Sequence, residues 1–412
     1  MYFSQTLYNL EECISRSDKK KYLSVKEKLL NEVSSKFHDF INVLNKKNIK
    51  EIETIGGKLR KFKNVIFLGT GGSSLGGKTL VSLKEKSITG KSPNIFFIEN
   101  IDLGSIDELI SKIDFNRTAI VVISKSGETI ETLAQFFYIR DHIKKNNFFT
   151  KFLIITENKK STLKAIQEQE NFEFIEHCSG IGGRFSVLSV VGLLPASIVG
   201  LKITDLSYGA KYFLNEITKN DGKYFDQYFL SSLAQVSLME KDVNICVIMP
   251  YVDRLINFSL WFRQLWAESI GKNNRGSTPL TAVGTVDQHS QLQLFLDGPK
   301  DKFFTIIGHK KKKTKTKIDC SFGKNNIFEI LHKKNLDLLL YYEMKATIMT
   351  IRKHKLPIRF FELNNISERT IGALIMFFLI ETIFCCYLID VDPFSQPAVE
   401  EGKKITKNLL QQ

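Results

Sequence analysis

The chain has 412 residues, of which 43% are hydrophobic and 25% charged, and its formal net charge at pH 7 is +14. This length and composition allow two or three packed domains and exclude an intrinsically disordered chain. The six cysteines have no C-x-x-C spacing, and no basic segment precedes an apolar run near residue 1. Scattered thiols suit a reducing compartment better than a disulfide framework, so we expect a cytoplasmic protein.

The positive charge would suit a nucleic-acid partner, because a lysine-rich run, HKKKKTKTK, occupies residues 309–317. The run contains no arginine and no aromatic residue for base stacking, and it follows the apolar stretch KFFTIIG. We therefore expect a solvated loop at the end of a strand, and no nucleic-acid partner.

Residues 1–45 are expected to form a helical N-terminal extension. Short apolar runs follow it, each ending in a polar loop and separated from the next by a helix-length segment. They are NVIFLGTGG from Asn64, NIFFIEN from Asn94, AIVVISKSGE from Ala119 and KFLIITEN from Lys151. Such runs are typical of buried parallel strands with helices between them. The pattern predicts a first doubly wound domain over residues 46–220.

The same alternation returns in the second half of the chain, with VNICVIMPY from Val243, FFTIIGH from Phe303 and PIRFFELNN from Pro357. It predicts a second doubly wound domain over residues 221–392, followed by a separate segment, 393–412. The expected fold class is therefore α/β, with two parallel sheets that are each covered by helices on both faces as an α/β/α sandwich.

One apolar segment, TIGALIMFFLIETIFCCYLIDV at residues 370–391, is long enough to cross a bilayer. Glu381 lies at its middle, where an acidic group costs roughly 2.5 to 3.5 kcal/mol on insertion scales. The flanks carry Glu368, Asp390 and Asp392 where a basic anchor would be expected. A helix that is apolar on all sides also suits the core of a large α/β protein, so we expect a buried helix and no membrane.

The first polar loop, GTGGSSLGGKT at residues 69–79, matches the phosphate-loop pattern G-x-x-x-x-G-K-[ST] from Gly72 onward. It lies between a predicted strand and a predicted helix, where free amides bind anions. The acidic Mg²⁺ ligand of a nucleotide hydrolase has only a weak counterpart in NIFFIENID, and the dinucleotide pattern fails because Ser74 replaces its third glycine. The loop predicts phosphate binding, and ATP binding through Lys78 stays open only as a minor alternative.

A second loop, ISKSGETIET at residues 123–132, follows the neighbouring strand. Ser124, Ser126 and Thr129 supply hydroxyls, and Gly127 frees the turn before a helix that begins near Glu128. Hydroxyls and amides at a helix start can hold a phosphate without a metal. The alternative is an ordinary serine-capped helix, which the density of hydroxyls makes the weaker interpretation.

This second loop resembles the sugar-phosphate-binding loop of the sugar-isomerase (SIS) domain. With further stretches in the same order, residues 65–403 resemble the glucose-6-phosphate isomerase family. Those stretches are GGRFSVLSVVGLLP from Gly182, LWAESIGK from Leu265, QHSQLQLFLDG from Gln288 and DPFSQPAVEEGK from Asp392.

The resemblance implies two SIS-type domains and a C-terminal segment, 393–412, that returns to the active site. It also implies interconversion of glucose 6-phosphate and fructose 6-phosphate through a cis-enediolate, without a metal or other cofactor. Glu268 matches the base that moves the proton between C1 and C2. His289 matches the ring-opening histidine, Lys403 the lysine beside the ring oxygen, and Arg184 the arginine that stabilises the enediolate.

In that family the active site lies at the interface of a homodimer, which implies that His289 acts on the partner subunit's site. The resemblance also implies a set of phosphate and sugar contacts: Gly72, Ser73, Ser124, Lys125, Ser126, Thr129 and Gln396. Lys78, which completes the phosphate-loop pattern, has no counterpart in this scheme.

The chain departs from the family at Pro397 and Ala398, where an aromatic residue and a glycine are usual, and at Ile270, where asparagine is frequent. Two alternatives remain open: a bifunctional glucose/mannose-6-phosphate isomerase and a non-catalytic SIS-type sugar-phosphate sensor. A sensor would keep the loop at residues 124–129 but would not need Glu268, His289 and Lys403 together.

Overall fold

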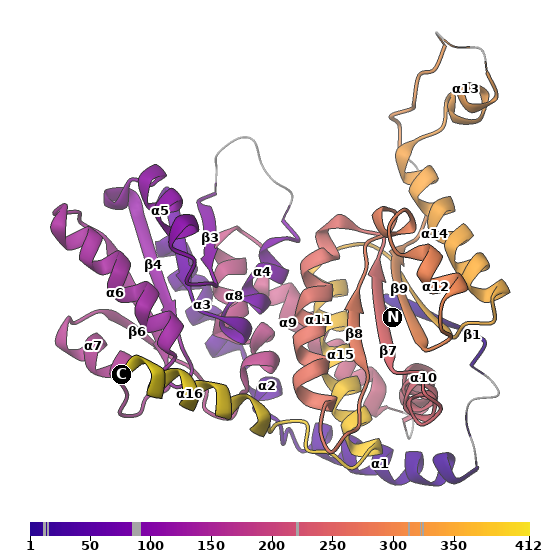
Figure 1. Cartoon of the computed structure of the whole chain (residues 1–412), viewed down its shortest axis with the longest axis horizontal. Coiled ribbons are helices and arrows are strands. Elements are labelled where there is room, and N and C mark those ends of the chain that lie inside the picture. The colour runs from indigo at the N-terminus through magenta and orange to yellow at the C-terminus, as the bar shows by residue number, and fades with distance from the viewer. Residues whose placement is uncertain are drawn as a thin grey trace.

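The structure is a computed structural model, and it describes residues 1–10, 14, 16–84, 92–219, 222–311, 314–321, 323 and 325–412. Two β-sheets lie on opposite sides of a central group of helices that includes α9 (Ile203–Thr218), α11 (Ile256–Ile270) and α15 (Glu368–Leu388) (Figure 1). The α/β class is confirmed. The boundary expected at residues 220 and 221 lies outside the described residues.

The first sheet has the order β3-β2-β4-β5-β6, and all its strand pairs are parallel. Alternate side chains of a strand point to opposite faces, so a strand covered on both faces is apolar throughout. In β2, Val65 and Phe67 enter one hydrophobic cluster, whereas Ile66 and Leu68 enter another. The strands are β2 (Asn64–Leu68), β3 (Asn94–Ile98), β4 (Thr118–Ile123), β5 (Lys151–Thr156) and β6 (Glu173–Glu176).

Helices cover both faces of this sheet, as a doubly wound sandwich requires. The face that belongs to the larger cluster carries α3 (Lys46–Leu59), α4 (Leu75–Val81) and α8 (Val190–Ile198), and the other face carries α5 (Leu103–Lys112), α6 (Ile130–Lys145) and α7 (Thr162–Gln169). Each parallel strand delivers its C-terminal loop to the same edge of the sheet, which is where the two phosphate-type loops lie.

The second sheet has the order β1-β10-β9-β7-β8. Strand β1 (Phe3–Tyr8) pairs antiparallel with β10 (Ile358–Leu363), and the other pairs, among β7 (Ile245–Pro250), β8 (Thr278–Thr281), β9 (Lys302–His309) and β10, are parallel. The N-terminal extension has the expected helices, but it also has a strand that the sequence analysis did not predict. The extension contributes an edge strand to the distant second sheet, followed by α1 (Arg16–Ser34) and α2 (Asp39–Asn42).

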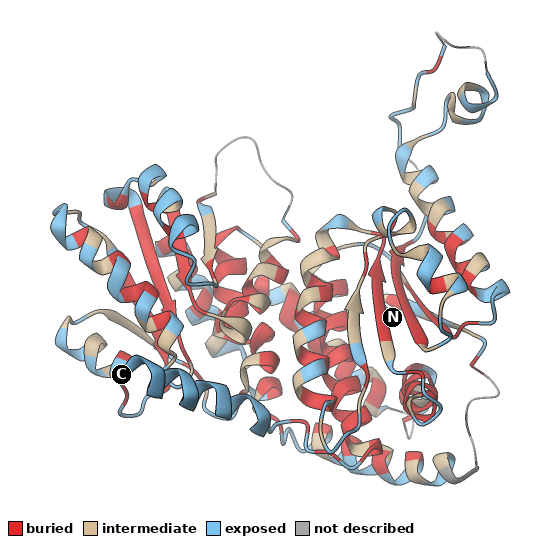
Figure 2. Ribbon diagram, viewed as in Figure 1, coloured by how far each residue is buried: buried red, intermediate tan, exposed pale blue. Residues whose placement is uncertain are grey.

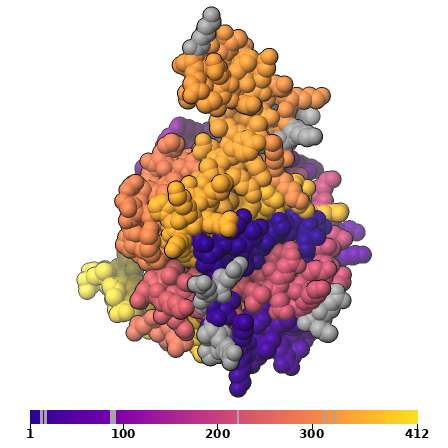
Figure 3. Space-filling model, turned by 90° about the vertical axis from the view of Figure 1, so that its right-hand side faces the viewer, coloured from indigo at the N-terminus to yellow at the C-terminus, as the bar shows by residue number. Residues whose placement is uncertain are grey.

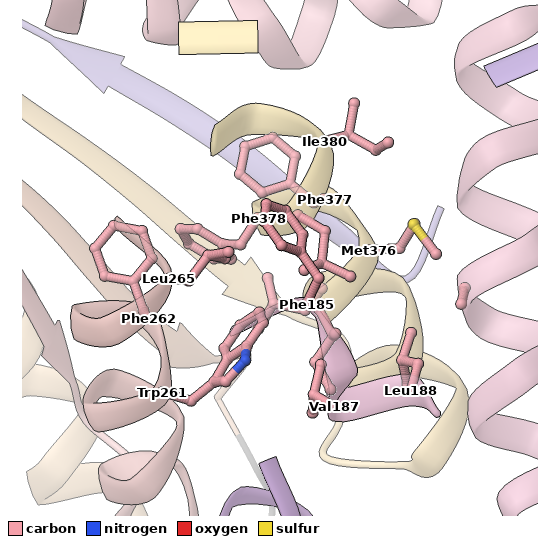
Figure 4. Close-up of a cluster of buried hydrophobic side chains, with 14 of the residues drawn as sticks. Phe185, Val187, Leu188, Trp261, Phe262, Leu265, Met376, Phe377, Phe378 and Ile380 are labelled. Atoms are coloured by element: carbon pink, nitrogen blue, oxygen red, sulfur yellow. The ribbon is translucent and has the colours of Figure 1, made fainter. Parts of the chain in front are cut away.

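The apolar segment at residues 370–391 lies in α15, where 94% of the most apolar window is buried inside the protein. Phe378 of this helix packs against Phe262 of α11, with ring centroids 5.1 Å apart (Figure 4). The prediction of a buried core helix is confirmed. It is the one helix long and apolar enough for a bilayer in the part of the chain that the structure describes.

Glu381, in the middle of α15, is fully buried and forms an ion pair with Arg359 of β10, which is also fully buried. Ser232 Oγ donates to the Glu381 carboxylate at 2.7 Å, and Arg359 Nη2 donates to Thr305 Oγ1 at 3.1 Å. A buried charge is tolerated only when it is paired and hydrogen-bonded. The acidic residue that argued against a membrane helix therefore has a structural partner in the second sheet.

The remaining helices are α10 (Lys223–Met239), α12 (Leu292–Asp297), α13 (Asn326–Leu331), α14 (Leu336–Lys353) and α16 (Glu400–Leu410). We call α13 together with the start of α14 the arm, because it stands off the body of the molecule (Figures 1 and 3). Helix α16 is exposed over its whole length (Figure 2). After β9, the described residues of the lysine-rich run, 310–311 and 314–317, form an exposed loop, whereas 312 and 313 lie outside the described residues.

Candidate active site

The first loop, residues 69–74, turns sharply where β2 ends. A Cβ on Gly69 would lie 2.9 Å from the carbonyl oxygen of Ile123, the last residue of β4. A Cβ on Gly72 would lie 2.3 Å from the carbonyl carbon of Gly183, and Ser186 Oγ donates to the Gly72 carbonyl at 3.1 Å. Glycine is therefore required at both positions, because the loop lies in contact with the end of β4 and with the GGRFS segment.

The same stretch does not have the geometry of a nucleotide phosphate loop. Helix α4 already begins at Leu75, so Gly76, Gly77, Lys78 and Thr79 all lie within it. Thr79 is fully buried and donates to the carbonyl oxygens of Leu75 and Asn257, and Lys78 forms an ion pair with Glu99 at the end of β3. The lysine and hydroxyl of the pattern have partners within the protein, so the structure does not favour the ATP alternative.

The second loop, residues 124–129, which we call the anion loop, joins β4 to α6. Ser124 Oγ lies 2.9 Å from Thr129 Oγ1, and Ser126 Oγ accepts from the Glu128 amide at 3.1 Å. Gly127 has a φ of +70°, a left-handed conformation that favours glycine, and a Cβ there would lie 2.2 Å from Ser161 Oγ. Ser126 is exposed and Lys125 is half-buried, so both can reach a bound anion.

Arg184 is the most heavily bonded side chain of the candidate site. Its residue is 1% exposed, and its Nε donates to Ser269 Oγ at 2.8 Å. Nη1 lies 3.1 Å from Glu268 Oε2 and also donates to Gln396 Oε1, while Nη2 donates to the carbonyl oxygens of Pro393 and Ser395. One guanidinium thus joins the end of α11 to the C-terminal segment.

The position of Arg184 follows from the apolar residues after it. Figure 4 shows Phe185, Val187 and Leu188 pointing into the core beside Trp261 of α11. Trp261 Nε1 also donates to the Arg184 carbonyl at 3.3 Å. Burial lowers the pKa of the Arg184 guanidinium, and the neighbouring Glu268 carboxylate opposes this by favouring the charged form. The charge is therefore kept at a fixed position with little access to water.

Glu268 lies near the C-terminus of α11, and its side chain is 28% exposed. Oε2 faces Arg184, and Oε1 accepts from Gln264 Nε2 at 2.8 Å. Glu268 and Gln396 line one open cavity of about 720 Å³, together with Lys272, Arg275 and Asp392 among others. A carboxylate that is oriented from both sides and still reaches a cavity is suited to transfer protons.

Gln264 is a site residue that the sequence analysis missed. It lies one helical turn before Glu268, and a Cβ on Gly71 would lie 3.1 Å from its Nε2. Gln264 therefore links the glycine-rich turn to the carboxylate. The signal in the sequence was the i, i+4 spacing of Gln264 and Glu268 on one helix face, which is informative only once Glu268 has been singled out.

His289 lies apart from this group. It follows the 3-10 turn Val286–Gln288, is exposed, and lines a separate hollow of about 500 Å³ beside Leu336 and Leu339 of the arm. None of its described contacts is with Glu268 or Arg184, so a single chain does not bring the histidine to the candidate site.

Lys403 is also separate from Arg184 and Glu268. It lies on α16 with a side chain that is 60% exposed, and its Nζ lies 2.7 Å from Glu400 on the same helix. Gln396 of the C-terminal segment contacts Arg184, but the exposed helix α16 that follows runs along the outside of the first domain (Figures 1 and 2).

Taken together, two phosphate-type loops at one sheet edge and an oriented carboxylate beside a buried arginine define a sugar-phosphate protein of the SIS type. Within the described residues there is no group of three or more His, Cys, Asp and Glu side chains arranged to hold a metal ion. The candidate site contains the Glu268 carboxylate, the Arg184 guanidinium and the two polar loops.

The family model for phosphoglucose isomerase matches residues 14–412, so the chain belongs to that family. It is 34% identical to a probable glucose-6-phosphate isomerase of Methanococcus maripaludis over 373 residues, covering 90% of this chain and 84% of the relative. It is 32% identical to the glucose-6-phosphate isomerase of Methanocaldococcus jannaschii, covering 95% and 93% of the two chains. The family resemblance of the motifs is confirmed.

Solved structures agree on the fold. A hypothetical protein of Thermus thermophilus superimposes with a TM-score of 0.85 at 25% identity, covering 98% of this chain and 99% of that one. A glucose-6-phosphate isomerase of Chlamydia trachomatis gives a TM-score of 0.75 at 22% identity, covering 90% of this chain and 74% of that one. A tagatose-6-phosphate ketose/aldose isomerase of Escherichia coli, at a TM-score of 0.56, shares the fold more distantly.

Proposed function

We propose that this protein interconverts glucose 6-phosphate and fructose 6-phosphate, as an aldose–ketose isomerase of the phosphoglucose isomerase family. The observation that carries the proposal is the Glu268 carboxylate, which Arg184 and Gln264 orient at the rim of a cavity, and Gln264 itself lies against Gly71 of the glycine-rich turn. The relatives that match most of this chain are named as glucose-6-phosphate isomerase or probable glucose-6-phosphate isomerase, which favours this activity over the mannose and sensor alternatives.

In the proposed mechanism, the anion loop and the glycine-rich turn bind the phosphate, through Ser124, Lys125, Ser126 and Thr129 together with Gly72 and Ser73. With the ring opened, Glu268 removes the proton from C2 of the aldose and returns it to C1 of the enediolate, while the hydroxyl proton on O2 passes to O1. The guanidinium of Arg184 offsets the negative charge that develops on the enediolate oxygens. A fixed cation in a site with little water does this without reorganising during the reaction.

Ring opening needs a proton donor and a group near the ring oxygen, and we assign these roles to His289 and Lys403. His289 is exposed beside the apolar side chains of the arm, so we infer that it serves the site of a second copy of the chain in a homodimer. Large apolar residues of the arm favour such an interface, namely Ile327, Ile330, Leu336, Leu339 and Tyr342.

Lys403 can act at the ring oxygen only if α16 leaves its exposed position. The helix has an apolar side that includes Ile405 and Leu409, which are 52% and 63% exposed. Docking of α16 over the cavity beside Gln396 would bury those side chains and carry the Lys403 ammonium toward the substrate. The departures at Pro397 and Ala398 lie in the turn on which this movement depends.

The test is a coupled assay of the purified protein on fructose 6-phosphate, with a chelator present throughout. We expect glucose 6-phosphate to form at an undiminished rate in the chelator, and Glu268→Gln protein serves as the control for contaminating isomerase. A matched assay on mannose 6-phosphate measures the range of substrates. Activity that is lost in the chelator, or that survives in the Glu268→Gln control, would contradict the proposal.

We also infer that the protein works in the cytoplasm. The five cysteines among the described residues are all free, which suits a reducing compartment, and the apolar helix that fits a bilayer by length is buried in the core. Fractionation of cells that express the full-length chain tests this location.

A further inference from the structure

The anion loop is braced by the segment that follows β5, residues 156–163. Thr156 Oγ1 and the Glu157 amide both donate to the Lys125 carbonyl, at 3.3 and 3.1 Å. The Leu163 amide donates to the Gly127 carbonyl at 3.1 Å. These hydrogen bonds hold the carbonyl oxygens of Lys125 and Gly127 against the bracing segment and so fix the conformation of the anion loop.

Within this segment, Glu157 faces the ammonium of Lys125. The Glu157 side chain is only 6% exposed, and its Oε1 lies 3.7 Å from Lys125 Nζ. Its other oxygen, Oε2, forms an ion pair with Lys159. The buried His177 lies close to both groups, and burial lowers its pKa and so favours the neutral imidazole. The lysine of the anion loop thus faces a buried carboxylate.

The effect of the Lys125–Glu157 ion pair on turnover rests on the proposed function. Substrate and product carry the same phosphate, so binding energy at the phosphate lowers the KM without raising kcat, and excess affinity slows product release. A carboxylate beside the lysine weakens the attraction for a phosphate dianion.

We propose that Glu157 is a positioning residue that holds Lys125 partly away from the phosphate and thereby limits the affinity of the anion loop. The carboxylate touches neither the substrate nor the reacting carbons. It acts through the Lys125 ammonium, and its contacts with Lys125 and Lys159 hold it at a fixed position.

Glu157→Gln tests the proposal, because the amide keeps the shape of the side chain and removes its charge. We expect calorimetry with inorganic phosphate to show binding that is about three- to tenfold tighter than in the unmodified protein. In the isomerase assay, KM for fructose 6-phosphate should fall by a similar factor while kcat stays equal or falls. A residue that only stabilised the fold would raise KM and weaken phosphate binding, and that result would overturn the proposal.

Two further variants separate the action through Lys125 from a general effect of charge. In a Lys125→Met background, Glu157→Gln should change phosphate affinity by less than about twofold, because the ammonium through which it acts is gone. Glu128→Gln removes a carboxylate from the anion loop itself, but Glu128 accepts from Thr162 and not from Lys125, so we expect it not to reproduce the tighter binding. An undiminished gain in the Lys125→Met background, or an equal gain in Glu128→Gln, would overturn the assignment.

The phosphate measurement does not depend on isomerase activity. If the protein proved inactive on sugar phosphates but Glu157→Gln still tightened phosphate binding, the proposed function would fail and the role of Glu157 would stand. Absence of phosphate binding in both proteins would overturn the site itself.

Discussion

Arg184 carries out two tasks that a lysine could not combine. Its three nitrogens donate to Ser269, Glu268, Gln396 and two backbone carbonyls, so the planar guanidinium joins α11 to the C-terminal segment. The same group presents its charge next to the Glu268 carboxylate. All five N–H groups are engaged within the protein, so the guanidinium acts on the charge that the proposed reaction develops through its fixed positive charge.

Glu268→Gln is the first prediction at the residue scale. The amide keeps the shape of the side chain but cannot accept the C2 proton, so kcat should fall on the order of 10² to 10⁴ while sugar-phosphate binding changes little. Steady-state kinetics measures the first effect, and calorimetry with 6-phosphogluconate, an unreactive sugar phosphate, measures the second. Near-native turnover would refute Glu268 as the base.

A second prediction concerns the hydroxyls of the anion loop. Ser126→Ala combined with Thr129→Ala removes two donors, and affinity for a sugar phosphate should weaken on the order of 1 to 3 kcal/mol for the pair. The loss should appear mainly in KM, because the phosphate does not take part in the proton transfer. As a matched control, Ser105→Ala on α5 removes an exposed hydroxyl away from the loop and should leave KM unchanged. A fall in kcat alone would contradict phosphate binding by these hydroxyls.

At the residue scale, the sequence motifs identified groups that the fold brings together and groups that it does not. Arg184, Glu268 and Gln396 come from distant parts of the chain and meet in the structure. Lys403 and His289 lie elsewhere, the first on an exposed helix and the second in a separate hollow. Their roles stay predictions.

At the scale of elements, the strands that the apolar pattern predicts lie mostly inside the sheets, and the strands that it does not predict lie at the edges. The seven apolar runs became β2, β3, β4, β5, β7, β9 and β10. The missed strands, β1, β6 and β8, all lie at sheet edges, whereas six of the seven predicted strands lie inside the sheets and only β3 lies at an edge in the part of the chain that the structure describes. Edge strands are covered less completely, so they tolerate polar residues and proline, as in the TPLT of β8, and lack a continuous apolar signal.

The buried ion pair between α15 and β10 gives a prediction about stability. Glu381→Gln leaves the fully buried Arg359 without its counter-charge, and the free energy of unfolding should fall by about 3 to 5 kcal/mol. Replacing both partners, with Arg359→Met and Glu381→Leu, should recover most of that loss because no charge is left unpaired. Urea denaturation followed by tryptophan fluorescence, which reports on Trp261 and Trp266 of α11, provides the measurement. A single variant as stable as the unmodified protein would contradict this account of the pair.

At the scale of the whole molecule, the separate hollows of His289 and Glu268 favour an active site that is shared between two copies of the chain. The hollow that holds His289 is lined by side chains of the arm, and the arm stands off the body where a second copy can contact it (Figure 3). A monomer would leave both the histidine and the apolar arm exposed. We therefore expect the isolated monomer to be inactive, and the homodimer to contain two sites that each use both chains.

Mixed dimers test this arrangement directly. Glu268→Ala chains and His289→Ala chains are each expected to be inactive as homodimers. After subunit exchange, each mixed dimer holds one site that lacks both groups and one site with an intact glutamate from its own chain and an intact histidine from its neighbour. With random exchange, half of the dimers are mixed, so about a quarter of all sites should regain activity. If both groups came from one chain, every site would lack one of them, and native mass spectrometry would find mixed dimers without isomerase activity.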